Sequence, residues 1–445
     1  MNKSTFPYLP FDPNKFPFFY GWVIILIGTV GVLMSTPGQT IGLSTFTDSL
    51  IEALMINRDQ LSLAYMFGTI SSSLLLTRAG KLYDRYGVRP VAILASVGLA
   101  FGLLYLSQID LVTQIVADRL ALQNTLYAAF PLVLLGFLCI RFFGQGVLTL
   151  VSRTMMMKWF DERRGLALGF SNVMMVLGFS YAPVVFEYLI QGYGWRAAWQ
   201  YMAVALLFVF PIIIFCFFRN DPRDVGLTPD GNFLKTKNAN QPIRFPVSKD
   251  YELKEVRRTF TFWVCALFVS MTGLYNTGFA FHIVSIFEQI GTPRAEAIRI
   301  FQWSAIVAVV STLVLSAWSD YVRMRYLLYL KGMAALIGLL GFIFLEQGAI
   351  AYWSLVVGNG LLNALYSVIG AVIWARFYGK KQLGAIIGQV MMLTVFASAI
   401  GPYLFSQSLS ISGSYDTSCW ICLAIYLSLA IGAFWVKNPQ LGKEE

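Results

Sequence analysis

Twelve apolar runs, each long enough to cross a membrane, limit the folds open to this sequence. A transmembrane helix needs roughly 20 predominantly apolar residues, and each run reaches that length. A backbone exposed to lipid has to satisfy its hydrogen bonds internally, so the runs are expected to be helices. The sequence therefore predicts an all-α polytopic membrane protein with twelve transmembrane helices in two pseudo-symmetric six-helix bundles. The runs are approximately 20–47, 60–79, 90–108, 127–152, 165–189, 197–218, 260–287, 297–318, 326–345, 350–375, 383–409 and 415–436.

The composition excludes the soluble classes. Of the 445 residues, 57% are hydrophobic and 13% are charged, whereas a soluble globular protein has about 45–50% apolar and about 25% charged residues. A large soluble enzyme and a disordered scaffold are therefore excluded. The five cysteines all lie in apolar runs and the chain has one histidine. We therefore expect no disulfide framework, no metal site and no cofactor.

The longest polar stretch, residues 219–258, separates the sixth run from the seventh and is interpreted as a cytoplasmic linker. It divides the chain into two halves of six runs. The predicted division is a cytoplasmic N-terminal segment (1–19), a first six-helix bundle (20–218), the linker (219–258), a second six-helix bundle (259–437) and a cytoplasmic tail (438–445).

The two halves also share a repeated G-x3-G-x13-P pattern. It occurs in the fifth run and again in the eleventh, which occupy equivalent places in the two halves, at Gly165, Gly169, Pro183, Gly384, Gly388 and Pro402. An internal parallel repeat is one of the known plans of membrane transporters.

The basic residues predict the orientation of the chain. There are 33 Lys and Arg against 23 Asp and Glu, which gives a formal charge of +10. Most of the basic residues lie in the segments that are cytoplasmic when the N-terminus is placed inside, as the positive-inside rule requires. We expect a multi-pass protein of the plasma membrane, the cell inner membrane in a bacterium, with both termini cytoplasmic. The expected partners are a small-molecule substrate, protons and membrane lipids, with no nucleic acid, and the protein is expected to be a monomer.

The end of the second run reads Gly80-Lys81-Leu82-Tyr83-Asp84-Arg85-Tyr86-Gly87-Val88-Arg89. This segment resembles the signature loop of the major facilitator superfamily, G-x-x-x-D-R-x-G-x-R. The resemblance implies a conformational latch that holds the two halves together in the outward-facing state. It would be formed by Gly80, Asp84, Arg85, Gly87 and Arg89. A generic basic cytoplasmic turn is the alternative.

Several loops are similar to those of the monocarboxylate and oxalate:formate carrier branch of that superfamily. They are Lys158-Trp159-Phe160, Arg163-Arg164-Gly165, Gly194-Trp195-Arg196, the segment from Asp221 to Gly231, and Arg376-Phe377-Tyr378-Gly379. The resemblance implies a small organic anion as substrate. The sequence departs from the branch in runs eight and eleven, where such carriers place a cation, because Arg299 lies near the outer end of run eight and run eleven has no cation.

Arg141 is the one basic residue that the sequence places near the middle of a run, and no acid is placed there. An ionisable group at that depth is a functional candidate because burying it is costly. A buried guanidinium can bind a carboxylate through two hydrogen bonds, which favours an anion-binding or coupling role. The alternative is a structural arginine held by backbone carbonyls of a neighbouring helix.

His282 lies in the outer third of run seven and is the candidate for proton coupling, since its unperturbed pKa is close to physiological pH. A hydrogen-bonded structural histidine is the alternative. The segments 37–40 and 271–278 combine Pro or Gly with polar residues. They are predicted to break run one and to break or bend run seven, as helices do at transporter binding sites.

Other polar or aromatic residues lie at mid-depth, where facing lipid would be costly. We interpret them as the lining of a polar substrate cavity, with interhelical hydrogen bonds as the alternative. Together with Arg141, the candidate substrate-binding residues are Gln39, Tyr181, Tyr275, Asn276, Trp303, Asn363 and Tyr366.

The predicted function is a secondary active transporter that moves a small organic solute, an organic anion in the first instance, by alternating access with protons as the candidate coupling ion. ATP-driven transport by this chain alone is not expected, because the sequence has no G-x-x-x-x-G-K-[ST] loop. A membrane enzyme is not expected either, because no mid-depth acid pair or histidine cluster is present. The alternatives are a carrier or exporter of a larger neutral or amphiphilic metabolite, siderophore-like or drug-like, and a non-transporting sensor on a carrier scaffold.

Overall fold

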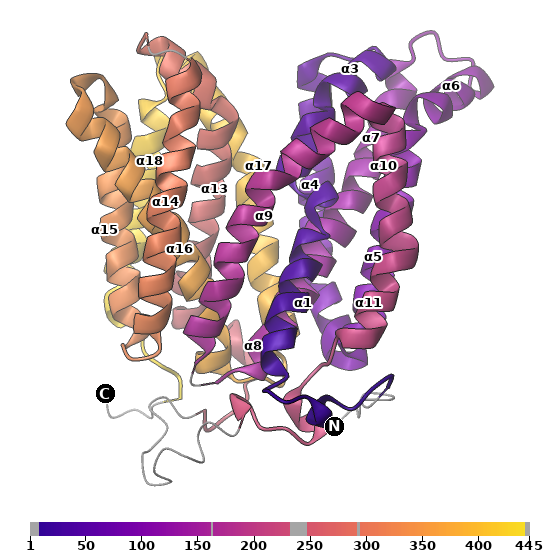
Figure 1. The fold of residues 1–445 in the computed structure, drawn as a ribbon. Helices are drawn as coiled ribbons and strands as arrows, with labels where there is room; N and C mark the ends of the chain where they lie inside the picture. The colour runs from indigo at the N-terminus through magenta and orange to yellow at the C-terminus, as the bar shows by residue number, and fades with distance from the viewer. Residues whose placement is uncertain (1–8, 162, 232–246, 292–293, 441–445) are drawn as a thin grey trace. The chain divides into compact units, whose positions relative to one another are not determined.

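The computed structural model describes residues 9–161, 163–231, 247–291 and 294–440, and each regular element among them is a helix (Figure 1). Parts of the predicted N-terminal segment, linker and tail therefore lie outside the described residues. The chain packs as two compact units. The first comprises residues 1–159, 174–234 and 387–389, and the second comprises residues 160–173, 235–386 and 390–445.

The first unit is built from the helices of the N-terminal half. α7 continues without interruption through a π-helical segment, η4, into α8, and α10 continues through a second one, η5, into α11. The elements are α1 (Gly21–Leu33), η2 (Thr36–Gly38), α2 (Thr40–Leu43), η3 (Ser44–Phe46), α3 (Thr47–Leu54), α4 (Arg58–Tyr86), α5 (Val88–Ser107), α6 (Ile109–Arg119), α7 (Leu126–Ile140), η4 (Arg141–Leu148), α8 (Thr149–Trp159), α9 (Arg164–Tyr193), α10 (Trp195–Val204), η5 (Ala205–Val209) and α11 (Phe210–Phe217).

The second unit is built from long helices of the C-terminal half, together with the first turns of α9. In it, α16 packs against α14 and α15, and α18 packs against α13 and α15. These helices are α13 (Phe260–Gln289), α14 (Arg294–Ser319), α15 (Met324–Ile343), α16 (Ala349–Tyr378), α17 (Leu383–Ser412) and α18 (Asp416–Gly432).

The predicted fold class is confirmed. By length and composition, 10 of the described helical stretches could cross a membrane. α1 is a shorter apolar helix of 13 residues, and α4 has 29 residues with a more polar sequence. With these two, the described helices account for the twelve predicted transmembrane helices in two six-helix bundles.

The first apolar run is not one helix. α1 ends at Leu33, and the chain continues through short 3-10 and α turns instead of a straight helix. The break lies at residues 36–40, which confirms the break predicted at Pro37 and Gly38. Proline cannot donate a backbone hydrogen bond, so it interrupts the helical ladder at this point.

The structure shows no break in run seven, because α13 is continuous from Phe260 to Gln289, and a bend there stays a prediction. Its glycines serve helix packing instead. A Cβ atom on Gly278 would lie 2.5 Å from the ring of Phe405, and one on Gly401 would lie 2.2 Å from the carbonyl oxygen of Leu274. Glycine at these positions lets α13 and α17 approach closely, as small residues do between membrane helices.

Asp320, directly after α14, caps the start of α9 within the second unit. Its carboxylate accepts hydrogen bonds from the backbone N–H groups of Gly165 (3.0 Å) and Leu166 (3.3 Å). The guanidinium of Arg376 lies 3.9 Å away. The first N–H groups of a helix have no partner inside the helix, and an anion at that end is favourable. Burial nevertheless raises the pKa of the Asp320 carboxyl from 3.8 to about 6, against the opposing effects of the two N–H groups and Arg376.

Replacing Asp320 with Asn is expected to change thermal stability in a pH-dependent way. The raised pKa means that the folded protein binds this proton more tightly than a free carboxyl group does. Relative to its value at higher pH, the free energy of unfolding of the wild type therefore rises by up to about 3 kcal/mol as the pH falls from about 6 to about 4, and above that range this group adds no further pH dependence. On going from about pH 7 to about pH 4.5, the melting temperature of the wild type should rise relative to that of Asp320→Asn. An equal difference at both pH values would contradict the assignment.

Candidate functional site

Arg141 forms the centre of a polar cluster in the first unit. It lies where α7 passes into η4 and is 2% exposed. Its Nη1 donates hydrogen bonds to the carbonyl oxygen of Gly38 (3.2 Å) and to the hydroxyl of Thr40 (3.3 Å). Its guanidinium carbon lies 5.1 Å from the ring centroid of Tyr65, which is within the range of a cation–π interaction.

Two close-packed glycines bring the broken first run against Arg141. A Cβ atom on Gly38 would lie 2.3 Å from the carbonyl oxygen of Ile140, and one on Gly144 would lie 2.9 Å from the Cα atom of Gly38. The break leaves the carbonyl of Gly38 available outside a regular helix. Close approach of these backbones places that carbonyl within reach of the guanidinium.

Gln39 extends the cluster toward α8. Its Nε2 donates to the hydroxyls of Ser35 (3.0 Å) and Thr149 (3.2 Å), which also bond to each other at 3.0 Å. The structure thus brings together two of the predicted substrate-binding residues, Arg141 and Gln39, around the break in the first run. The hydroxyls of Thr40 and Tyr65, the two residues that contact the Arg141 guanidinium through side chains, form a hydrogen bond of 2.7 Å with each other.

Two polar atoms of η4 are buried with unused hydrogen-bonding capacity. Among the described residues, Arg141 Nε and Gln145 Oε1 are buried without a hydrogen-bond partner. One is a donor and the other an acceptor, and buried polar groups are normally paired. Gln145 was not among the predicted binding residues, although it is the next polar residue after Arg141 in the same apolar run.

A second polar cluster lies between α13 and α16 in the second unit. The Tyr275 hydroxyl donates to Asn359 Oδ1 at 2.9 Å, and Asn276 Nδ2 donates to Asn363 Oδ1 at 2.6 Å. Asn363 Nδ2 in turn donates to the carbonyl oxygen of Asn359 at 2.9 Å. Asn359, Asn363 and Tyr366 follow one another at helical spacing, so they share one face of α16. Of the predicted residues, Asn276 and Asn363 are therefore bonded directly, and Tyr275 is linked to Asn363 through Asn359.

Lys331 of α15 corrects the census of buried cations. The sequence analysis placed Arg141 alone near the middle of a run, whereas Lys331 follows soon after the start of run nine. In the structure its side chain is completely buried. Its Nζ lies 5.6 Å from the ring centroid of Tyr366, so the second cluster contains a cation.

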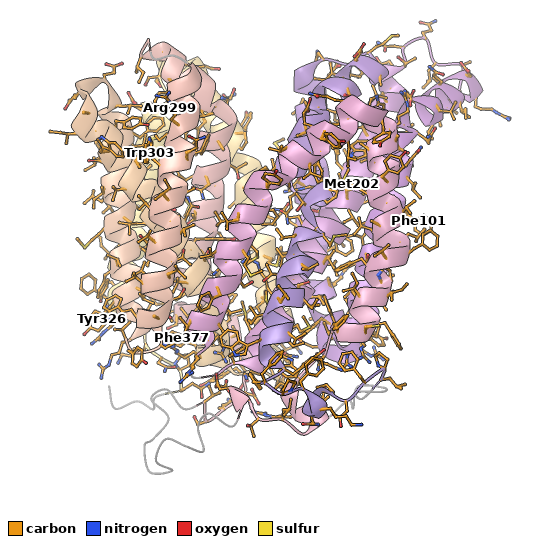
Figure 2. All side chains as sticks on the ribbon, in the orientation of Figure 1. Phe101, Met202, Arg299, Trp303, Tyr326 and Phe377 are labelled. Carbon is orange, nitrogen blue, oxygen red and sulfur yellow. The ribbon has the colours of Figure 1, made fainter. Side chains whose placement is uncertain are left out.

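Trp303 and Tyr181 lie apart from these clusters. Trp303 is 45% exposed on α14, where Figure 2 shows it near Arg299 at the upper end of that helix, and its ring contact is with Trp353 at 5.8 Å. Tyr181 of α9 is 67% exposed. A role for either residue in substrate binding stays a prediction.

His282 has partners at both ring nitrogens. Nε2 lies 3.0 Å from the carbonyl oxygen of Pro402, and Nδ1 lies 3.3 Å from the hydroxyl of Tyr415. A carbonyl accepts only, so Nε2 carries a proton and Nδ1 accepts from the hydroxyl in the neutral ring. These contacts match the structural alternative for His282, in which the side chain joins α13 to the residues around Pro402.

The predicted latch residues run from the last two turns of α4, through Gly87, to the first turn of α5. Gly87 adopts a positive φ of 82°, which glycine adopts at little cost, and it forms the boundary between the two helices. Arg89 donates from Nε to the carbonyl oxygen of Phe218 (3.0 Å) and from Nη2 to that of Leu9. Arg85 is exposed, with its guanidinium 5.2 Å from the ring of Tyr86. These contacts of Arg89 lie within the first unit, so the latch itself stays a prediction.

Sequence comparison identifies relatives over most of the chain. The family described as Major Facilitator Superfamily matches residues 28–402. YhjX, an uncharacterized MFS-type transporter of Escherichia coli (strain K12), is 25% identical over 383 residues, which cover 82% of this chain and 85% of the relative.

Solved structures share the fold. The proton:xylose symporter XylE superimposes with a TM-score of 0.65 at 17% identity, covering 94% of this chain and 96% of that one. The E. coli fucose:proton symporter FucP gives a TM-score of 0.64 at 14% identity, and the match covers 94% of this chain and 99% of FucP. The human organic anion transporter MFSD10 gives a TM-score of 0.60 at 16% identity, and the match covers 93% of this chain and 99% of MFSD10.

Proposed function

We propose, on the premise that this chain belongs to the Major Facilitator Superfamily, that it carries a small organic anion across the cell membrane by alternating access. Membership makes the chain a multi-pass secondary transporter and not an enzyme. The proposal adds the class of substrate and protons as the coupling ion. It also includes the monocarboxylate and oxalate:formate branch, for which the loop resemblances are the support.

The observation that carries the anion proposal is the unneutralised charge of Arg141. The guanidinium is buried, yet its hydrogen bonds run to a carbonyl and a hydroxyl, and no described carboxylate forms an ion pair with it. Among the described residues, the most buried acid is Asp230, in the linker, at 6% exposed. A buried cation favours an anionic ligand strongly, because the ligand supplies the missing countercharge and can accept two hydrogen bonds.

The orientation and location of the carrier belong to the same proposal. The basic residues between the helices favour cytoplasmic termini and a cytoplasmic linker. The membrane would be the plasma membrane, or the inner membrane in a bacterium.

Flux into proteoliposomes tests the proposal. Vesicles containing the purified protein are given radiolabelled lactate, oxalate or a neutral sugar, with and without an inward proton gradient. We expect protein-dependent uptake of at least one carboxylate, increased by the gradient, and none of the sugar. Uptake of the sugar without uptake of either carboxylate would contradict the anion proposal and favour the alternative of a neutral solute.

Replacing His282 with Ala is expected to lower stability and to leave the pH dependence of that uptake unchanged. The substitution removes two hydrogen bonds within the second unit, each with a net value of about 1 kcal/mol. The melting temperature should therefore fall, while the ratio of uptake at two pH values stays that of the wild type. Loss of the pH dependence together with near-normal stability would instead assign the coupling proton to His282.

A further inference from the structure

The second unit buries a lysine side chain that no described acid neutralises. Lys331 is the eighth residue of α15 and is 0% exposed. Its Nζ has no hydrogen-bond partner among the described residues. An ammonium group has three N–H donors, and all three are therefore unused.

The side chain does not reach the end of its helix. At 1.5 Å per residue, Lys331 lies about 10 Å from the start of α15. A lysine at such a depth usually extends its chain toward water at the membrane surface. Here the lysine side chain points into the interior of the second unit, where its aromatic neighbours lie on α13 and α16.

Two aromatic rings face the ammonium group. Its Nζ lies 5.9 Å from the ring centroid of Phe268 on α13 and 5.6 Å from that of Tyr366 on α16. Cation–π contacts of this length favour the charged form. They provide no lone pair for the N–H donors, so the hydrogen-bonding requirement of the group remains unmet.

Polar groups lead away from Lys331 along α16. Tyr366 is half-buried, and Asn363 lies one helical turn before it on the same face, also half-buried and bonded to Asn276. The next turn carries Asn359, which accepts from the Tyr275 hydroxyl. The cation thus lies beside Tyr366, at one end of the polar stripe formed by Asn359, Asn363 and Tyr366 on α16.

We propose that Lys331 is an anion-binding residue of the second unit, which holds the carboxylate of a small organic acid beside Tyr366. This inference rests on the proposed function, and it names a binding residue that the sequence analysis did not identify. A neutral carbonyl would satisfy one donor and leave the charge. A carboxylate satisfies the donors and neutralises the charge, so it is the ligand that a buried, unpaired ammonium group favours.

Lys331→Met tests the proposal, since methionine has similar length and no charge. The wild type, Lys331→Met and the control Lys254→Met, at an exposed lysine of the described linker, are purified in detergent without anionic lipid. Melting temperatures are measured with and without lactate, oxalate and succinate. We expect Lys331→Met to melt higher than the wild type without ligand, because an unpaired buried charge has been removed. Its affinity for the stabilising acid should fall about tenfold or more, whereas Lys254→Met should behave as the wild type in both respects.

The outcomes separate the inference from the proposed function. If an acid stabilises the wild type and Lys331→Met equally, Lys331 does not bind the anion, and the anion proposal stands on Arg141. If no acid stabilises the wild type, the anion class is wrong and the inference fails with it. A lower melting temperature of Lys331→Met without ligand would show that the ammonium stabilises the fold, which also overturns the inference. Should Lys331→Met fail to fold, Lys331→Gln takes its place, with Lys331→Arg expected to keep the response.

Discussion

Replacing Arg141 with Gln should reduce the affinity for an anionic substrate by about ten- to a hundredfold. A hydrogen bond to a charged group contributes about 1.5–3 kcal/mol, and 1.4 kcal/mol corresponds to a factor of ten. Glutamine can still donate to the carbonyl of Gly38, but it cannot neutralise a carboxylate or form two parallel hydrogen bonds with it. Arg141 Nε, which has no partner in the described structure, is the donor that such a ligand would use first.

The measurement is the ligand-induced shift in melting temperature, followed by uptake into proteoliposomes. Arg119→Gln is the matched control, because Arg119 is exposed at the end of α6 and should affect neither quantity. Arg141→Lys keeps the charge and loses the fork of donors, so its affinity should lie between those of the wild type and Arg141→Gln. If Arg141→Gln melts lower without ligand and keeps the full ligand-induced shift, the arginine is structural.

Replacing Gly401 with Ala is expected to destabilise the second unit by about 1–3 kcal/mol, the range found when atoms are added to a closely packed core. The added Cβ would lie 2.2 Å from the carbonyl oxygen of Leu274, so the backbones of α13 and α17 would have to separate. For a domain of this size the loss corresponds to a fall of roughly 2–12 °C in melting temperature.

Gly370→Ala provides the matched control for this effect. Gly370 is also a glycine inside a long helix, but a Cβ atom there would meet nothing within 4 Å. The intrinsic helix preference of alanine should then raise stability by about 0.5–1 kcal/mol. Equal effects of the two substitutions would mean that the close approach at Gly401 does not limit stability.

The sequence predicted the helices well because their signal is local. A run of some 20 apolar residues identifies a transmembrane helix without knowledge of its neighbours. The break at Pro37 could also be predicted from the sequence, because the missing backbone N–H of proline disrupts the helix within one turn of that residue. Gly273 and Gly278 show the limit, because glycine in a helix is compatible with either a break or a close helix contact, and only the position of α17 decides between them.

The candidate site was harder to predict because burial depends on distant residues. Lys331 and its two aromatic neighbours lie on three different helices, and no local pattern brings them together. Tyr275, Asn276 and Asn363 were predicted individually, yet the bonds from Tyr275 to Asn359 and from Asn276 to Asn363 depend on the packing of α13 against α16. Trp303 was chosen for its depth in run eight, and its partly exposed ring contacts Trp353 of α16, a pairing that no local pattern predicts.

The π-helical segment η4 has a consequence for how relatives of this chain are aligned. One turn of a π-helix contains more residues than one turn of an α-helix, and π-helical segments are frequent at functional sites. Each residue of an α-helix advances the side-chain direction by about 100°. A relative that lacks one residue within 142–147 would therefore keep Arg141 in place and yet present a different face of α8, with Thr149 turned away from Gln39. A one-residue gap in this segment would mark a change in the neighbours of Gln39, even where every surrounding letter of the sequence is the same.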